Sequence, residues 1–177
     1  MTPALNLARL NAMDQAGFTA MLGAIFEHSP WVAEGAWPQR PFDTIERLHA
    51  AMCGVVANAG AAAQLALMRA HPQLASKAAV RGELTEASHR EQGGAGLREC
   101  SPEEFALLGE LNARYQQRFG FPYILAVRGH DRSSIIGDLQ ARLERSRAIE
   151  FAEGMRQIEK IAALRLADLL DAHAPAD

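Results

Sequence analysis

The stretch SPEEFALLGELNARYQQRFG, residues 101–120, contains the signals that begin and end a long α-helix. Ser101 is a favourable N-cap, Pro102 suits the first helical position, and Glu104 completes a capping box with Ser101. Gly120 is the residue type that most often closes a helix at its C-terminal end. Apolar residues between these ends recur at helical intervals, so the stretch predicts one continuous helix.

Helical periodicity extends over the rest of the chain, and the strict alternation typical of strands is rare. The last helix shows the pattern most clearly, and we interpret its apolar face as core: Met155, Ile158, Ala162, Leu166, Leu169 and Leu170. Short turns bearing Gly or Pro separate further predicted helices near residues 6–14, 17–27, 43–58, 60–70, 85–93 and 133–146. The sequence therefore predicts an all-α, compact bundle of about eight helices.

Length and charge limit the class of protein. At 177 residues the chain suits a single domain, residues 1–177, because a chain of about 150 residues buries roughly 70% of its unfolded surface. A net charge of -3 gives no general attraction to nucleic acid or to anionic lipid. The longest apolar run, CGVVANAGAAAQLALM, is too short and too weakly apolar for a membrane span. Since the N-terminus lacks a signal-peptide pattern, we expect a cytoplasmic protein.

The cysteines give no sign of a disulfide framework. Cys53 and Cys100 are far apart in the sequence and form no Cys-x-x-Cys pair. We expect both to be ordinary buried thiols.

Residues 70–92, AHPQLASKAAVRGELTEASHREQ, open with a histidine suited to proton transfer. Residues before proline are pushed out of helical geometry, so Pro72 should end the preceding helix at or just before His71. The helix dipole at that C-terminus favours the protonated imidazole and moves its pKa upward. A histidine that only ends a helix is the ordinary alternative.

A polar face follows in the same stretch. Ser88, Glu91 and Gln92 are spaced i, i+3 and i+4, which places their side chains on one side of a predicted helix. Such a face is more often solvated surface than a site. From spacing alone, the stretch indicates only a possible catalytic site.

Residues 119–134, FGFPYILAVRGHDRSS, form the second informative stretch. Their apolar, aromatic and β-branched character, interrupted by Pro122, predicts an extended, buried segment. Arg128 follows directly, and a buried guanidinium needs an anionic partner, either a protein carboxylate or a substrate anion. Extended backbone would also leave amide donors free for the carbonyl oxygens of a ligand.

Four stretches together resemble the OHCU decarboxylase family: HPQLASKAA, LTEASHREQGGAGL, LNARYQQRFGFPYILAVRG and EHSPWVAEGAW. The similarity runs in the same order from about residue 18 to about residue 170. The resemblance implies an all-helical fold, no cofactor, and conversion of 2-oxo-4-hydroxy-4-carboxy-5-ureidoimidazoline (OHCU) to (S)-allantoin with release of carbon dioxide. It also implies a homodimer.

The resemblance implies a role for each candidate side chain. The family's catalytic His falls on His71, which we expect to act as general acid/base, with Glu91 orienting it or the substrate. One position departs from the family pattern, because Arg145 stands where many members have Asn. The expected substrate-binding residues are Pro72, Ser88, Gln92, Phe121, Pro122, Tyr123, Ile124 and Arg128.

Two other classes of protein compete with this interpretation. A zinc hydrolase could use His71, His89 and Glu91, but His89 and Glu91 are two residues apart on a helix and point to different sides. No His-Glu-x-x-His motif occurs in the sequence. A non-enzymatic helical interaction module is supported by composition alone. We expect a small-molecule substrate, no metal, no nucleic-acid partner and no membrane.

Overall fold

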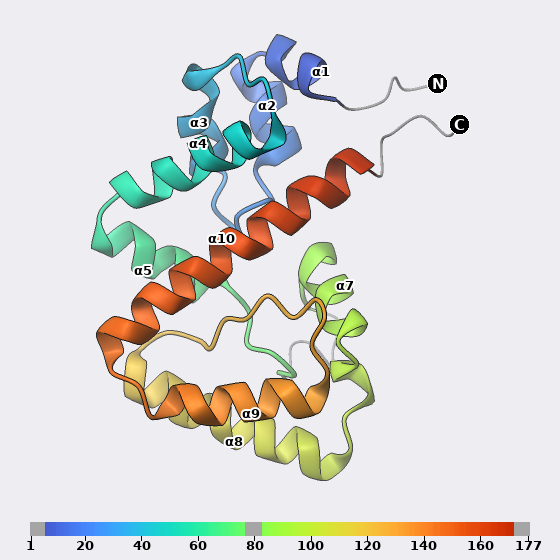
Figure 1. Cartoon of the computed structure of the whole chain (residues 1–177), viewed down its shortest axis with the longest axis vertical. Coiled ribbons are helices and arrows are strands. Elements are labelled where there is room, and N and C mark those ends of the chain that lie inside the picture. Colours follow the sequence, from blue (N-terminus) through green and yellow to red (C-terminus); the bar gives the residue numbers. More distant parts are fainter. Residues whose placement is uncertain (1–5, 77–82, 172–177) are drawn as a thin grey trace. The chain divides into compact units, whose positions relative to one another are not determined.

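The structure is a computed structural model that describes residues 6–76 and 83–171 (Figure 1). Every regular element within these ranges is helical, and they contain no strand. The α-helices are α1 (Leu7–Ala12), α2 (Gln15–Leu22), α3 (Trp31–Ala36), α4 (Ile45–Asn58), α5 (Ala61–Ala70), α7 (Glu86–Gly94), α8 (Pro102–Phe119), α9 (Arg132–Leu143) and α10 (Arg147–Asp171). Two short 3-10 helices are η1 (Trp37–Gln39) and η2 (Leu97–Glu99). The predicted all-α class is confirmed.

Helix α8 has the ends that its sequence predicts. The Glu104 N–H donates to the Ser101 hydroxyl at 3.1 Å, and the Ser101 N–H donates to the Glu104 carboxylate at 2.9 Å. Gly120 closes the helix with a φ of 81°, in the left-handed region that glycine adopts without strain. Both ends are set by local chemistry, which explains why the sequence predicts them well.

Other helices differ from the prediction. Helix α2 ends at Leu22, although buried Ile25 and Phe26 continue the apolar pattern beyond it. Helix α3 was not predicted, because its six residues are too few to establish a period. Helix α10 begins well before the predicted face, at Arg147. Two residues of that face, Met155 and Leu169, are half-buried, while Ile158, Ala162, Leu166 and Leu170 are buried.

The chain packs as two compact units. The first unit contains the residues up to Ala70 and those from Glu159 onward, and the second is His71–Ile158. Helix α10 contributes residues to both. The single domain inferred from length therefore stays a prediction. All the candidate site residues belong to the second unit.

The second unit contains two neighbouring helices joined by an extended segment. Helices α8 and α9 lie side by side, and residues 120–131 carry the chain back along α8 before α9 begins (Figure 1). An 18-residue helix is about 27 Å long, and twelve residues span about 40 Å when fully extended, so a non-helical segment of this length can return along the helix. The segment is therefore a long stretch of non-helical backbone inside a helical unit.

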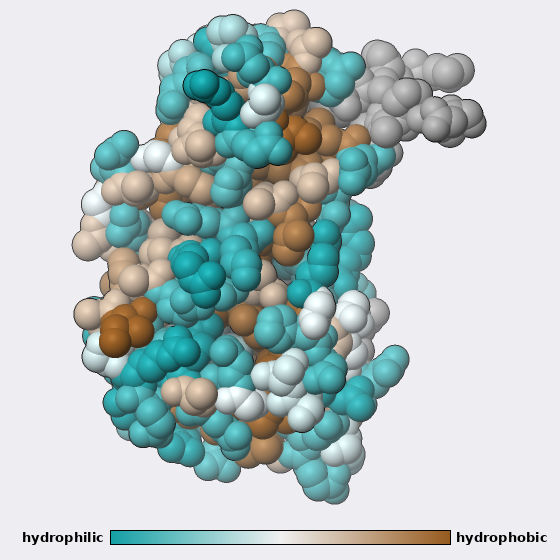
Figure 2. Space-filling model, viewed as in Figure 1, coloured by the Kyte–Doolittle hydropathy of each residue, from teal (hydrophilic) through white to brown (hydrophobic). Residues whose placement is uncertain are grey.

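Hydrophilic side chains cover most of the face that Figure 2 shows, with smaller hydrophobic patches between them. None of the helices in the described ranges is by itself long and apolar enough to cross a membrane. Helices α4 and α5 reach that length and composition only as a pair bent by 117°.

Candidate active site

His71 lies where its neighbouring proline predicts. Helix α5 ends at Ala70, and His71 is the first residue beyond it. Its side chain is buried, whereas Pro72 is half-buried. The predicted end of the helix is confirmed, and the imidazole lies inside the protein.

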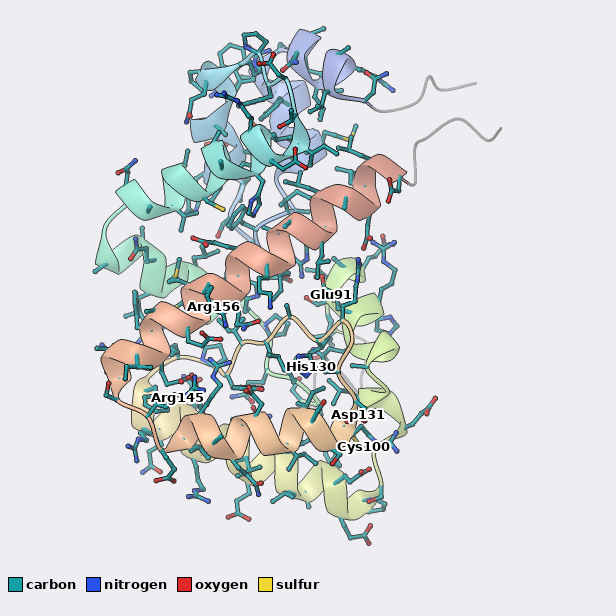
Figure 3. The ribbon with its side chains drawn as sticks, viewed as in Figure 1. Glu91, Cys100, His130, Asp131, Arg145 and Arg156 are labelled. Atoms are coloured by element: carbon teal, nitrogen blue, oxygen red, sulfur yellow. The ribbon has the colours of Figure 1, made fainter. Side chains whose placement is uncertain are left out.

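Helix α7 carries the predicted polar face, and much of that face points inward. Thr85 caps the helix, since its hydroxyl accepts a hydrogen bond from the Ser88 N–H at 3.3 Å. Ser88 and Gln92 are buried, and Glu91 between them in sequence is half-buried. Figure 3 shows Glu91 on helix α7. The alternative of an entirely solvated polar face is therefore wrong.

A hydrogen bond joins the loop after His71 to helix α7. The Ala75 N–H donates to the Gln92 side-chain oxygen at 3.0 Å, and both residues are buried. Because Ala75 follows His71 by four residues and Gln92 adjoins Glu91, this bond places the two catalytic candidates on contacting segments. The structure thus brings together two parts of the site that the sequence separates.

The segment after Gly120 is extended and buried, as predicted. Residues 121–127 are all buried and contain no helix. The Ile124 carbonyl accepts from Arg142 at 2.8 Å, and the Ala126 N–H donates to Gln157 at 2.9 Å.

Three other backbone N–H groups of this segment lack an acceptor in the part of the chain that the structure describes. Within the two described ranges, the N–H groups of Phe121, Tyr123 and Ile124 donate to no protein acceptor. Buried backbone donors are nearly always paired with protein, water or ligand. These amides suit the carbonyl or carboxylate oxygens of a small molecule.

The burial of Arg128 differs from the prediction. Arg128 is exposed, because the buried run ends at Val127. The expectation that burial of its guanidinium demands an anionic partner is therefore wrong. Its role in binding substrate remains a prediction that rests on the resemblance alone.

A buried polar network lies beside the extended segment and was not predicted. Arg142 on α9 donates from Nε to the Glu150 carboxylate of α10 at 2.8 Å. The Tyr115 hydroxyl of α8 donates to the same carboxylate, and the Tyr123 hydroxyl donates to Asp138 at 2.5 Å. Arg142 and Glu150 are 1% and 0% exposed, so a full ion pair is buried here. The network connects three helices with the segment that carries the unpaired amides.

Burial strengthens the preference of both tyrosines for the protonated form. It is the main cause that raises the pKa of both hydroxyls, and hydrogen bonds to Glu150 and Asp138 raise the pKa of Tyr115 and Tyr123 further. Both groups therefore remain protonated donors at neutral pH. Their hydroxyls hold the network together and are poor candidates for a base.

Metal and thiol chemistry gain no support from the side chains that the structure describes. No three His, Cys, Asp or Glu side chains cluster there as metal ligands would, so His71, His89 and Glu91 do not form such a group. Cys53 and Cys100 are free and partly exposed rather than fully buried. Burial, with a contribution from Glu159, raises the pKa of Cys53 to about 12. A thiolate nucleophile is disfavoured at that position.

Comparisons with known proteins point to one family. The family model described as OHCU decarboxylase matches residues 11–167. A human protein named as a putative OHCU decarboxylase is 39% identical over 168 residues, which cover 95% of this chain and 97% of the relative. An OHCU decarboxylase of Haloferax volcanii is 38% identical over 164 residues, covering 93% of this chain and 95% of the relative. A crystal structure of an (S)-allantoin synthase is similar with a TM-score of 0.75 and 30% identity, over 94% of this chain and 55% of the other.

Proposed function

Because the chain belongs to the OHCU decarboxylase family, we propose that it converts OHCU to (S)-allantoin and carbon dioxide. The observation that carries the proposal is the match of the OHCU decarboxylase family model to residues 11–167. The hydrogen bond between Ala75 and Gln92 supports the assigned site, because it brings the His71 loop against helix α7. Relatives that cover nearly the whole chain are named for this decarboxylation.

The proposed chemistry needs controlled proton transfer. Decarboxylation breaks the bond between a ring carbon and its carboxylate, and the adjacent unsaturated ring takes up the electron pair. The substrate therefore provides its own electron sink, a task that other decarboxylases assign to a cofactor. A proton must then be delivered to the ring. We assign His71 as the general acid/base, with Glu91 orienting the imidazole or the substrate.

The proposed binding groups complement a substrate rich in carbonyl and N–H groups. The unpaired amides of Phe121, Tyr123 and Ile124 suit its carbonyl oxygens. Gln92 offers a further donor, because its Nε2 is buried and has no hydrogen-bond partner among the described residues.

The remaining members of the proposed binding set are assigned by resemblance. Ser88 would fix the ring and ureido group, and exposed Arg128 would bind an anionic oxygen. Pro72 and Pro122 complete the proposed contacts. Delivery of a proton from one side only would yield a single enantiomer of allantoin.

The experiment that tests the function generates OHCU in place. A urate-oxidising enzyme and a hydroxyisourate hydrolase together convert urate to OHCU in the reaction mixture. The purified protein is then added to the fresh OHCU. The expected result is rapid appearance of optically active (S)-allantoin. Slow, racemic formation at the rate without protein would contradict the proposal and favour the interaction-module alternative.

The proposal also includes a homodimer and a cytoplasmic location. The homodimer rests on the resemblance, and light scattering of the purified protein checks it by giving twice the mass of one chain. Fractionation of the producing cells checks the location.

A further inference from the structure

One peptide group in the loop after His71 is held at both of its ends by side-chain amides. The Leu74 carbonyl accepts from Asn112 Nδ2 at 2.9 Å, and the Ala75 N–H donates to Gln92 Oε1 at 3.0 Å. These two backbone groups belong to the same peptide bond. Asn112 on α8 and Gln92 on α7 therefore hold the loop from two different helices.

The backbone fixes the orientation of both amides. Gln92 must present its oxygen to the Ala75 N–H, and Asn112 must present its nitrogen to the Leu74 carbonyl. The C=O and N–H of a trans peptide point in opposite directions, so the two side chains approach from opposite sides. Their remaining polar atoms, Asn112 Oδ1 and Gln92 Nε2, are buried and have no partner in the described residues.

The held peptide carries unusual backbone geometry. Ala75 has a φ of 50°, in the left-handed region that residues with a Cβ rarely adopt. Such a conformation persists only where the surroundings hold it. The two amide hydrogen bonds provide that restraint, and loss of the Asn112 bond removes one of them.

We propose that Asn112 is a positioning residue of the candidate active site, which sets the place of His71 relative to helix α7 through the Leu74–Ala75 peptide. The inference rests on the proposed function. His71 precedes the held peptide by three residues, and Glu91 adjoins Gln92. A shift of the peptide therefore changes the separation between the proton-transfer group and the residue proposed to orient it.

The effect on rate should be large compared with the effect on stability. Misplacement of a reacting group by about 1 Å can lower a rate about 100-fold. Since Asn112 is 3% exposed and reaches the loop only through its amide, removal of that amide shifts the loop and leaves the ionisable groups intact.

Two variants and one control test the proposal. Asn112→Leu keeps the approximate shape and removes both polar atoms, whereas Asn112→Ala removes the whole amide and with it the donor to Leu74. Leu108→Val lies one turn earlier on α8, is fully buried and leaves the amide in place. For each protein we would measure kcat, KM and thermal unfolding with OHCU generated in place.

The expected result is a loss of about 10- to 100-fold in kcat for both Asn112 variants while the proteins remain folded. Leu108→Val should keep the kcat of the wild type, even if its unfolding temperature falls as far as that of the Asn112 variants. Wild-type kcat in Asn112→Leu would overturn the proposal, because that side chain can make no hydrogen bond to the loop. An equal loss of kcat in Leu108→Val would also overturn the proposal, because lower stability would then explain the slower reaction.

Amide hydrogen exchange separates this inference from the proposed function. Exchange at Ala75 should become faster in Asn112→Leu and stay unchanged in Leu108→Val, whatever the substrate is. Absence of turnover in the wild-type protein would contradict the proposed function alone. Unchanged exchange at Ala75 in Asn112→Leu would overturn the role of Asn112.

Discussion

Arg142 carries a buried charge whose partners connect helix α9 to the extended segment. Its guanidinium donates from Nε to Glu150 and from Nη1 to the Ile124 carbonyl, and the single nitrogen of an ammonium does not reproduce this fixed two-atom geometry. We predict that Arg142→Lys lowers the free energy of unfolding by about 1–3 kcal/mol through loss of a charged hydrogen bond. Urea unfolding measures the change.

Arg145 provides the matched control for that substitution. It also pairs with Glu150, at 3.3 Å, but its side chain is 40% exposed. Arg145→Lys should change the free energy of unfolding by less than about 1 kcal/mol, because solvent reaches the Arg145 side chain and screens its charge. If the two variants lost the same free energy of unfolding, the hydrogen bond from Arg142 to the Ile124 carbonyl would not contribute to stability.

Arg128 gives a second prediction for a single residue. Arg128→Lys keeps the charge but loses the two-pronged geometry that matches a carboxylate. We expect a higher KM for OHCU with an unchanged unfolding temperature, because the side chain is exposed. An unaltered KM would remove Arg128 from the binding set.

The single residues also show where sequence reasoning succeeds. The end of α5 before His71 depends on Pro72 alone, so local chemistry predicts it. The burial of Arg142 could have been suspected, because it follows Ile135 and Leu139 on one helical stripe. Its partner Glu150 lies on another helix, and no spacing in the sequence pairs them. The same limit applies to Asn112 and the loop it holds.

Helix α7 is the element that presents Ser88, Glu91 and Gln92. Thr85 caps it, and Thr44 caps α4 in the other unit with the same type of bond, from the Arg47 N–H at 3.2 Å. Each Thr→Ala change should lower the free energy of unfolding by about 0.5–2 kcal/mol. Only Thr85→Ala should also raise the KM for OHCU, since α7 carries proposed binding residues and α4 carries none. A KM that rises equally in Thr44→Ala would refute the assignment to α7.

The sequence predicts those elements best whose start and end signals lie within the element itself. Helix α8 was predicted with both ends because its cap, proline and glycine all lie within the stretch. The extended segment was predicted from its composition and Pro122. Periodicity does not predict helix α3, because its six residues are too few and its N-cap, Pro30, offers no side-chain hydrogen bond.

At the scale of the whole molecule, α10 belongs to both compact units as one continuous helix. Unfolding either unit would remove packing from part of that helix. We therefore predict a single cooperative thermal transition, with equal calorimetric and van't Hoff enthalpies. Two resolved transitions in scanning calorimetry would contradict the proposal of one domain.

The proton-transfer role of His71 is tested most directly by the initial rate of (S)-allantoin formation in His71→Asn. The side chains are similar in size, but asparagine cannot exchange a proton near neutral pH. The rate should fall about 100- to 10,000-fold, with thermal unfolding confirming a folded protein. His89→Asn, on the same stretch of chain, should keep nearly the wild-type rate. A wild-type rate in His71→Asn, or a loss only in proportion to unfolded protein, would contradict the assignment of His71.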